Sequence, residues 1–521
     1  MDNDPVLEEH KAELRVNPVF TVDKPDADVR PVVNYSKALD DGGPSLNDRI
    51  RRGPKATVEY LRAIEIIATL LLVLQYLGAA SVWAQDLDEG YYNCRVQPSQ
   101  IWALAFSFAG FIFVPMVLAM GLTSAPLIFT VFMAHVVMAI RLADRDLMYI
   151  TVPIAAVNRS LWQTDAGLIY DRDKGVVQVP LILYYLDDIF GIGHPSWVWR
   201  QFFSAKETLR WLSLWAKVQK DRVPALINIL LGVEYDIPKR CCRTPRQKGE
   251  RYIQFADRLL AKKTMTKSEG ASLTGKVRHM ASHCRTLNSF ARSVEVHFLR
   301  HRNGNEIKWH HRINITGTLR ADIQLLRDGI QMAMLHDLPW NHIIQEPSDT
   351  DIQLYTDAAG VHGGIGGFVD VAKTNYFQVH WKEVTLLPHC DILWQELVAL
   401  YVALRVNLRM LHGHHVGFYS DNEPIIWMLI KGRAPMERPD LQLLIREFHR
   451  LCLFNMIEPW WAHIPGDENV TADRLSRFHP EPFAGTDLQP TTNQHDLALA
   501  SLRRALIDTK RFHIDSAHLV L

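Results

Sequence analysis

Two adjacent carboxylates, Asp187 and Asp188, interrupt an apolar run in the stretch LILYYLDDIFGIG (181–193). β-branched and aromatic residues on both sides of a short polar centre predict a β-hairpin with the acids at its turn. Asp is also an ordinary turn residue, and the same dipeptide at Asp40 and Asp41 precedes two glycines in a typical turn composition. The pair therefore indicates chemistry only if further acids join it.

Asp86 is the acid best placed to join the pair, because it ends an apolar, β-prone run in SVWAQDLDEGYYNCRV. Two-metal phosphoryl transfer needs carboxylates from separate elements that converge on two Mg²⁺ ions about 4 Å apart. One ion activates the attacking oxygen and the other stabilises the leaving oxygen. Between these acids, MGLTSAPLIF predicts a Gly and Pro turn that enters a helix and suits the backing of a template or nucleotide.

The order of these motifs resembles motifs A, B and C of reverse transcriptases: Asp86 with Tyr91, then VLAMGLTSAPLIF, then Tyr185 to Asp188. Upstream, VFTVDKPDADVRPVVNYS followed by SLND resembles the fingers hairpin of that family. Its phosphate-binding residues match Lys24 and Arg30, which would pair with the triphosphate through charge-assisted bonds. Exposed hairpin charges are the alternative for both. Downstream, LLGVEYD resembles the primer grip, and SLTGKVRHMASHC resembles the thumb helices.

This resemblance covers about residues 16 to 300 and implies a right-hand polymerase of fingers, palm and thumb. It implies that Asp86 and Asp187 are the principal metal ligands and that Asp188 supports them. Tyr91 would lie under the sugar and exclude a 2′-hydroxyl, with a core aromatic as its alternative role. The stretch between motifs B and C is longer than is usual for the family.

A second set of acids lies at the ends of elements in a C-terminal α/β pattern and comprises Asp357, Glu396, Asp421 and Asp473. Each acid alone is most simply a solvated surface charge. Their order on a strand, strand, helix and strand frame resembles ribonuclease H across about residues 350 to 480. His463 matches the mobile histidine loop of that family, with a hydrogen-bonded structural histidine as the alternative. The resemblance implies a second two-metal site, which cleaves the RNA of a hybrid with assistance from His463.

The predicted fold class is α+β and α/β, with a right-hand polymerase followed by a ribonuclease H-like domain. The predicted parts are fingers and palm over 1–235, a basic thumb or connection region over 236–340, the ribonuclease H-like domain over 350–480, and a linker or tail without its own core pattern over 481–521. From Asp236 to Arg320 the chain has 19 Lys and Arg against 6 Asp and Glu, an excess of 13 positive charges. This excess favours an acidic partner, with a solvated helical face as the alternative.

The composition of the 521-residue chain, with 48% hydrophobic and 22% charged residues and zero net charge, is that of a globular protein. Six cysteines without CxxC spacing and a charged N-terminus without a signal-peptide core predict an intracellular setting, in the cytoplasm, the nucleus or both. The uncharged run 96–140 would pass a hydropathy test for membrane helices, but Pro115, Gly121, Pro126 and His135 interrupt it. As the core of a palm domain this run needs no membrane, so we expect no transmembrane segment.

The wording of HIPGDENVTADRLSR, and of VRPVVNYS followed by GGPSLND, most resembles DIRS-like retrotransposons, which integrate by DNA recombination through a tyrosine recombinase. The resemblance implies an RNA-directed DNA polymerase with ribonuclease H activity that uses two Mg²⁺ ions per site, or Mn²⁺. Its partners would be an RNA template, a DNA primer, RNA–DNA hybrid, dNTPs and other element-encoded proteins. Caulimovirus-like or long-terminal-repeat elements are a second choice. The alternatives of another class are an inactive or domesticated remnant that binds nucleic acid and an integral membrane protein.

Overall fold

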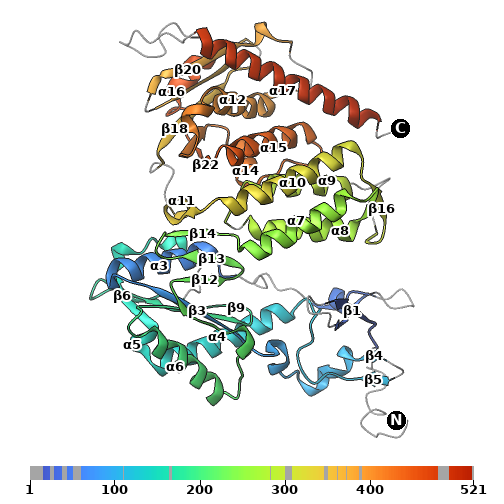
Figure 1. Ribbon diagram of the computed structural model, residues 1–521, viewed down its shortest axis with the longest axis vertical. Coiled ribbons are helices and arrows are strands. Elements are labelled where there is room, and N and C mark those ends of the chain that lie inside the picture. The colour runs from blue at the N-terminus through green and yellow to red at the C-terminus, as the bar shows by residue number, and fades with distance from the viewer. Residues whose placement is uncertain are drawn as a thin grey trace. The chain divides into compact units, whose positions relative to one another are not determined.

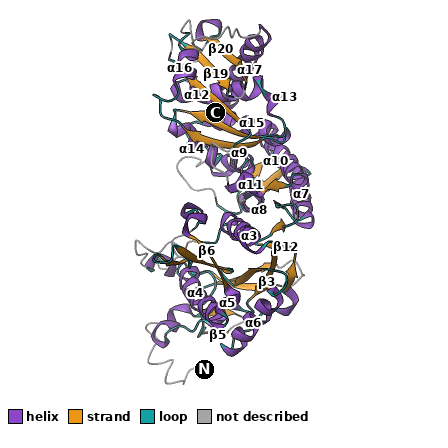
Figure 2. Ribbon diagram, turned by 90° about the vertical axis from the view of Figure 1, so that its left-hand side faces the viewer, coloured by secondary structure: helices purple, strands orange, loops and turns teal. Residues whose placement is uncertain are grey.

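The computed structural model describes residues 16–23, 29–37, 44–50, 60–108, 111–162, 167–281, 283–299, 308–344, 350–360, 362–370, 372–385, 390–478 and 492–518 (Figure 1). The described chain is a mixed α/β protein, which confirms this part of the predicted fold class. It divides into two compact units, the first comprising Met1–Leu231 with Asp236–Pro238 and the second Gly232–Tyr235 with Lys239–Leu521. Figure 2 shows that helices and strands occur together in each unit.

An antiparallel four-stranded sheet in the order β11-β3-β10-β9 is the centre of the first unit. Its strands are β3 (Ser81–Asp86), β9 (Ile182–Tyr185), β10 (Asp188–Gly193) and β11 (Arg222–Ala225). Helix α6 (Val198–Trp211) packs on β3 and β10, and α4 (Ala125–Ala143) packs on β9 and α6. The apolar residues that predict the hairpin, such as Ile189 and Phe190, are buried in this sheet.

Helix α4 forms most of the second half of the uncharged run. By length and composition alone it is long and apolar enough to cross a membrane, a property it shares with core helices. One face is fully buried, through Phe129, Met133 and Ile140 among others, because it lies against β9 and α6. Pro126 occupies the first turn, where the missing N–H breaks no helical hydrogen bond.

The long stretch between the glycine turn and Asp187 forms a separate antiparallel sheet in the order β6-β8-β7. Its strands are β6 (Tyr149–Pro153), β7 (Ile169–Asp171) and β8 (Val176–Pro180). Because the additional residues of this stretch form their own sheet, they do not interrupt the residue-by-residue pairing of β10 with β3. The remaining elements of the first unit are β1 (Val19–Asp23), β2 (Val29–Val33), α2 (Leu46–Arg49), α3 (Ala63–Leu77), β4 (Phe106–Phe108), β5 (Phe111–Phe113), α5 (Arg145–Met148) and β12 (Ile227–Leu230).

Four helices form the basic part of the second unit, namely α7 (Arg246–Leu260), α8 (Lys267–Met280), α9 (Leu287–Leu299) and α10 (Gly317–Leu335). They share a core that includes Phe290 and Leu326. A capping box between Thr266 and Glu269 starts α8. The shorter elements nearby are β13 (Val233–Asp236), β14 (Cys241–Arg243), β15 (Thr264–Thr266), β16 (Arg312–Asn314), β17 (Leu338–Pro339) and α11 (Trp340–Ile344). All six cysteines of the chain are free thiols.

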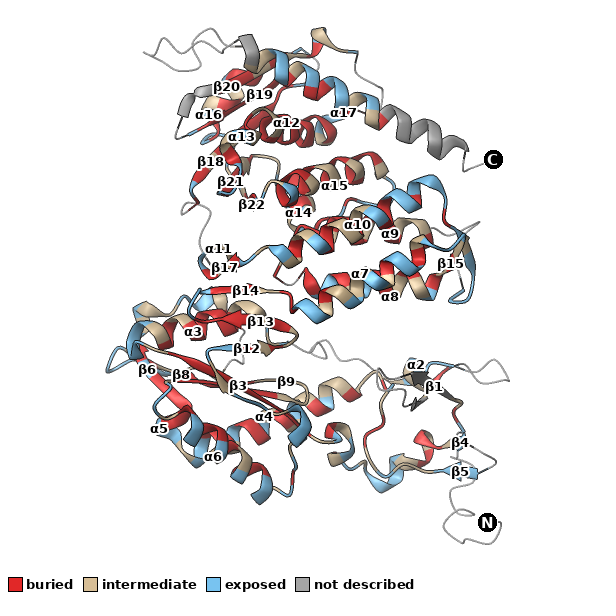
Figure 3. Cartoon of the chain, viewed as in Figure 1, coloured by how far each residue is buried: buried red, intermediate tan, exposed pale blue. Residues whose placement is uncertain are grey.

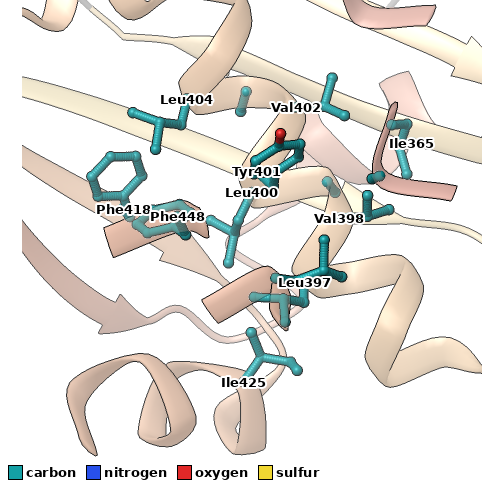
Figure 4. Close-up of a cluster of buried hydrophobic side chains, with 14 of the residues drawn as sticks. Ile365, Leu397, Val398, Leu400, Tyr401, Val402, Leu404, Phe418, Ile425 and Phe448 are labelled. Atoms are coloured by element: carbon teal, nitrogen blue, oxygen red, sulfur yellow. The ribbon is translucent and has the colours of Figure 1, made fainter. Parts of the chain in front are cut away.

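A five-stranded sheet in the order β20-β19-β18-β21-β22 organises the rest of the second unit. Its strands are β18 (Ile352–Ala358), β19 (Gly364–Val369), β20 (Ala372–His380), β21 (His415–Ser420) and β22 (Glu458–His463), and its helices are α12 (Ile392–Val406), α13 (Leu408–Leu411), α14 (Glu423–Lys431), α15 (Pro439–Phe454) and α16 (Val470–Ser476). β19 is antiparallel to β18 and β20, whereas β21 is parallel to β18 and β22. Figure 4 shows Leu397, Leu400 and Leu404 of α12 gathered with Phe418 and Phe448.

The two faces of this sheet carry different helices. Leu354 belongs to the large core that includes α12 and α15, whereas its neighbour Tyr355 packs against Ala472 and Leu475 of α16. Successive residues of a strand point to opposite faces, so α16 covers the face away from α12. Asp357 is two residues beyond Tyr355 and therefore shares the α16 face.

Helix α17 (Thr492–His518) lies where the sequence predicts a linker or tail without a core pattern. It packs on α12 and β20, and its residues Ala498, Leu502 and Ala505 are buried in the large core. Their spacing is helical, but alanines make the apolar stripe too narrow to stand out in the sequence. Figure 3 shows α17 as a half-exposed helix near the largely buried α12. The difference from the prediction is that α17 is a further helix on this sheet, beside α12 to α16.

Candidate functional site

The β9–β10 hairpin brings Asp187 and Asp188 to Asp86 at the end of β3. Asp188 lies directly opposite Asp86 in the pairing of β10 with β3. The turn is formed by Leu186, with a left-handed φ of 52°, and by Asp187. Non-glycine residues adopt that conformation mainly where surrounding structure constrains them. The Leu87 N–H donates to the Asp187 carbonyl at 2.8 Å, which ties the turn to the strand that carries Asp86.

Burial and neighbouring carboxylates raise the proton affinity of Asp187 and Asp188. Burial raises the pKa of Asp188 to about 7, and the Asp187 and Asp86 carboxylates add to the rise. Burial and then Asp86 raise the pKa of Asp187 as well. Mutual repulsion of this kind is relieved when a cation binds between the acids. Carboxylate oxygens are the ligands that a divalent ion prefers, but the ligand atoms of these three acids do not all lie within 4.8 Å of one another in this structure.

Lys220 was not predicted from the sequence as a site residue, and it places a positive charge at the first site. Its Nζ forms an ion pair with the Asp86 carboxylate, and this hydrogen bond raises the pKa of Lys220. The Lys217 N–H donates to the Asp86 carbonyl at 2.7 Å, and Lys217 Nζ lies 3.5 Å from Asp88 Oδ1. The segment that follows α6 thus runs along the end of β3 and places its lysines beside the acids.

Tyr91 is held next to the hairpin by α4. Its ring stacks on Phe129, with 4.5 Å between ring centroids and 21° between ring planes. A Cβ on the preceding Gly90 would come within 2.8 Å of the Phe129 ring and 3.0 Å of Asp187 Cβ, so the close approach requires glycine. Burial, with Tyr60 and Asp187, raises the pKa of Tyr91 to about 12. The phenol is therefore neutral and fixed beside the carboxylate turn.

Asn47, from the SLND stretch, clamps the glycine turn that precedes α4. Its Nδ2 donates to the Gly121 carbonyl at 3.0 Å, and its Oδ1 accepts from the Thr123 N–H at 2.9 Å. Gly121 has a φ of +101°, and a Cβ there would lie 2.7 Å from the Val33 carbonyl oxygen. Only glycine fits this position. The sequence resemblance includes SLND but assigns it no role. The structure shows that Asn47 of this stretch holds the glycine turn in place.

The two residues expected to bind phosphate are not both described. Lys24 lies outside the described residues. Arg30 lies on β2 opposite Val22 of β1, so the expected hairpin is present, but its side chain is not described. Binding of the triphosphate by this pair stays a prediction.

The second site forms where β18 and β21 end. These strands are parallel neighbours, so Asp357 near the end of β18 and Asp421 just after β21 meet at one edge of the sheet. Glu396 joins them from the second turn of α12. Ligand atoms of the three acids all lie within 4.8 Å of one another, and no other such group occurs among the residues that the structure describes. This largely buried acidic set could hold a metal ion.

The electrostatics of the second site favour a cation. Burial, with Asp357 and Asp421, raises the pKa of Glu396 to about 9. Burial also raises the pKa of Asp357 to about 6, and it raises the pKa of Asp421. At neutral pH and without a metal, the set therefore carries at least one proton. Ser420 Oγ donates to Glu396 Oε2 at 3.4 Å.

We expect divalent-ion binding at the second site to release protons. Glu396 is protonated at neutral pH and must lose its proton to become a ligand, so affinity should rise with pH up to about 9. Calorimetric Mn²⁺ titration near neutral pH, in buffers of different ionisation enthalpy, should show about one proton released per site. Glu396→Gln should remove most of that release. Equal release by both proteins would contradict a protonated Glu396.

Asp473 and His463 flank the acidic set. The Asp473 carboxylate on α16 helps to raise the pKa of both Asp357 and Asp421, so it faces the same space. Its Oδ1 accepts from Arg477 Nε at 2.5 Å. His463 ends β22, is exposed, and has its Nε2 3.1 Å from the Asp421 carbonyl oxygen. All five residues predicted for this site thus lie in one region.

Two further residues fasten α16 to this site. Ser476 is fully buried, and its Oγ contacts the Asp357 carboxylate. Asn469 Nδ2 donates to the Thr356 carbonyl at 3.0 Å. Neither was predicted as a site residue, although both lie in the stretch NVTADRLS that carries Asp473. That stretch was the signal that could have identified them.

No family model and no curated protein matches the chain. Among solved structures, it is similar to the foamy viral protease-reverse transcriptase dRH in complex with double-stranded DNA, with a TM-score of 0.41 and 14% identity over 86% of this chain and 65% of that chain. It is also similar to the foamy viral protease-reverse transcriptase in complex with RNA/DNA hybrid, with a TM-score of 0.39 and 14% identity over 92% of this chain and 53% of that chain. The chain spans less than two thirds of the length of these two viral proteins.

Proposed function

We propose that this chain is an RNA-directed DNA polymerase with ribonuclease H activity from a DIRS-like retrotransposon. The observation that carries the proposal is the occurrence of two carboxylate sets, one on each of two sheets, in the motif order of that family. The first set comprises Asp86, Asp187 and Asp188, and the second comprises Asp357, Glu396, Asp421 and Asp473. One set would copy an RNA template into DNA, and the other would remove the RNA of the resulting hybrid.

At the first site, Asp86, Asp187 and Asp188 would hold two Mg²⁺ ions, or Mn²⁺. When bound at either site, such ions activate the attacking oxygen and stabilise charge on the leaving oxygen. Lys220, which pairs with Asp86 in this structure, would face the negative triphosphate once a cation neutralises that acid. Tyr91, fixed on Phe129, would limit the space at the sugar 2′ position.

At the second site, the four acids would hold the ions and His463 would move a proton. The imidazole of His463 is exposed, and its Nε2 lies 3.1 Å from the Asp421 carbonyl oxygen, a position that suits proton transfer to the departing oxygen. Contacts with 2′-hydroxyl groups would select the RNA strand of the hybrid.

The same proposal assigns the parts of the chain and their partners. Residues 1–235 would be fingers and palm, 236–340 a thumb or connection region, and 350–480 the ribonuclease H-like domain, to which α17 adds a helix. The basic helices would bind the primer, the template and the hybrid by neutralising phosphates. We place the chain in the cytoplasm, the nucleus or both, with no membrane partner.

The direct test uses the full chain in two assays. Extension of a DNA primer on an RNA template with dNTPs and Mg²⁺ should occur and should stop on addition of EDTA. Cleavage of end-labelled RNA in a hybrid should show the same metal requirement. Tight hybrid binding without either activity, over a range of templates and of Mg²⁺ and Mn²⁺ concentrations, would instead support the inactive, nucleic-acid-binding remnant.

Tyr91→Val should let the first site accept ribonucleotides. Loss of the ring opens space at the 2′ position, so the ratio of kcat/KM for rNTP to that for dNTP should rise roughly 10- to 100-fold. Single-nucleotide extension with each substrate measures this ratio. Tyr92→Val is the matched control, because the neighbouring Tyr92 is 47% exposed. A Tyr91 variant with unchanged sugar discrimination would remove the gate role.

A further inference from the structure

Ser476 engages one oxygen of the central acid of the second site. Its Oγ contacts Asp357 Oδ2 and also lies 2.9 Å from the Asp473 carbonyl oxygen. A hydroxyl has a single hydrogen to donate, and a carboxylate is a stronger acceptor than an amide carbonyl. Ser476 therefore donates to Asp357, and the other oxygen of this carboxylate stays available for a cation.

Two glycines make room for Ser476. Gly366 lies directly opposite Asp357 in the pairing of β19 with β18. A Cβ on Gly366 would come within 2.5 Å of Leu475 Cβ and 2.7 Å of the Ser476 amide nitrogen, and a Cβ on Gly363 would lie 2.9 Å from the Ser476 carbonyl oxygen. Backbone atoms cannot rotate away from such a contact, so a larger residue would displace the end of α16.

Contacts between the rest of α16 and the sheet hold Ser476 next to Asp357. Asn469, the residue before α16, donates to the Thr356 carbonyl at 3.0 Å. Ala472 and Leu475 are fully buried against the sheet in a cluster with Phe368. The helix is thus fixed at both ends and along its apolar side. A hydroxyl held this firmly can restrict the orientation of the carboxylate that it contacts.

We propose that Ser476 is a positioning residue for the metal ligand Asp357. Gly366 and Gly363 have no side chains, and this allows the end of α16 to come close enough for Ser476 to contact Asp357. The hydroxyl fixes one carboxylate oxygen, so that the carboxylate meets Glu396 and Asp421 in an orientation ready for a divalent ion. This inference rests on the proposed function only in one respect, namely that the bound metal would serve cleavage of RNA in a hybrid. Metal binding by the acidic set can be measured without it.

The test is Mn²⁺ binding by the full chain, followed by electron paramagnetic resonance, in an Asp86→Asn and Asp187→Asn background that weakens the first site. Ser476→Ala should lower Mn²⁺ affinity at the second site about tenfold, as loss of a partner of a metal ligand commonly does. Ser476→Cys, which keeps a weak donor, should fall between. In the otherwise unaltered chain, Ser476→Ala should raise the Mg²⁺ concentration for half-maximal hybrid cleavage about tenfold and leave the KM for hybrid unchanged.

Matched substitutions separate positioning from general damage. Gly366→Ala should reproduce the loss of metal affinity, whereas Gly360→Ala should be silent because a Cβ there meets nothing within 4 Å. Ser501→Ala removes another buried hydroxyl, on α17, which donates to the Leu497 carbonyl at 2.7 Å, and should leave metal affinity unchanged. Thermal unfolding of each variant reports folding. If Gly366→Ala does not fold, the two Ser476 variants decide.

The outcomes distinguish this inference from the proposed function. Unchanged Mn²⁺ affinity in folded Ser476→Ala, with hybrid cleavage intact, would overturn the positioning role and leave the nuclease standing. Weakened Mn²⁺ binding in a chain that cleaves no hybrid would support the positioning role and count against the nuclease.

Discussion

Asp187→Asn is expected to abolish primer extension, with a rate at least about 10³-fold lower than that of the unaltered chain, or about 4 kcal/mol of lost transition-state stabilisation. Asparagine keeps the size of the side chain but removes the charge that would bind a cation next to Asp86. Hybrid cleavage should persist, because the second carboxylate set lies on another sheet. Single-turnover extension on an RNA template measures the first effect, and cleavage of labelled hybrid measures the second.

Two controls accompany this prediction. Asp146→Asn, at an exposed position on α5, should extend primers normally. Thermal unfolding of Asp187→Asn itself tests whether that variant folds, and Asp188→Asn in metal-free buffer tests the electrostatics of the hairpin. Because the folded pKa of Asp188 is raised to about 7, its contribution to stability is present below the unfolded pKa and is lost as pH rises toward 7. Above that pH the variant should unfold at a higher temperature than the unaltered chain. An inactive Asp187→Asn variant that also unfolds at a lower temperature than the unaltered chain would point to damage of the fold.

Asp357→Asn is expected to remove hybrid cleavage to a similar extent, about 10³-fold, while primer extension continues. Asp357 is the acid that Ser476 orients and that shares a metal-sized space with Glu396 and Asp421, so its charge is central to the second set. End-labelled RNA in a hybrid reports cleavage, and extension on the same template reports the first site. Asp370→Asn, at an exposed position just after β19, is the matched control. Loss of both activities in Asp357→Asn would argue against separable sites.

The parts of the molecule that the sequence predicted are those specified by local patterns. The β9–β10 hairpin follows from apolar runs around a short polar centre, and β18, α12 and β21 follow from alternating strand and helix periods. Asp86, Asp357 and Asp421 each lie at or next to the end of a strand, as the sequence predicts, whereas Glu396 and Asp473 lie within helices. Asp357 and Asp421 are brought together by the parallel pairing of their strands, which the α/β order already indicates.

The parts that could not be predicted depend on contacts between distant residues. Lys220 meets Asp86 across 134 positions, and Ser476 meets Asp357 across 119. A lysine or a serine carries no periodic signal, so only the folded chain shows which acid it contacts. The clamp that Asn47 places on Gly121 is of the same kind. In the sequence Gly366 has no feature that separates it from other strand glycines. Only the structure shows that the end of α16 packs directly against it.

The position of α17 sets an order of events during protein synthesis. Its residues Ala498, Leu502 and Ala505 complete a core whose central helix, α12, is translated about a hundred residues earlier. Until α17 leaves the ribosome, a nascent chain keeps part of the α12 surface uncovered, whereas every strand of the sheet that carries Asp86 has already been translated. The half that would copy RNA can therefore mature before the half that would destroy it.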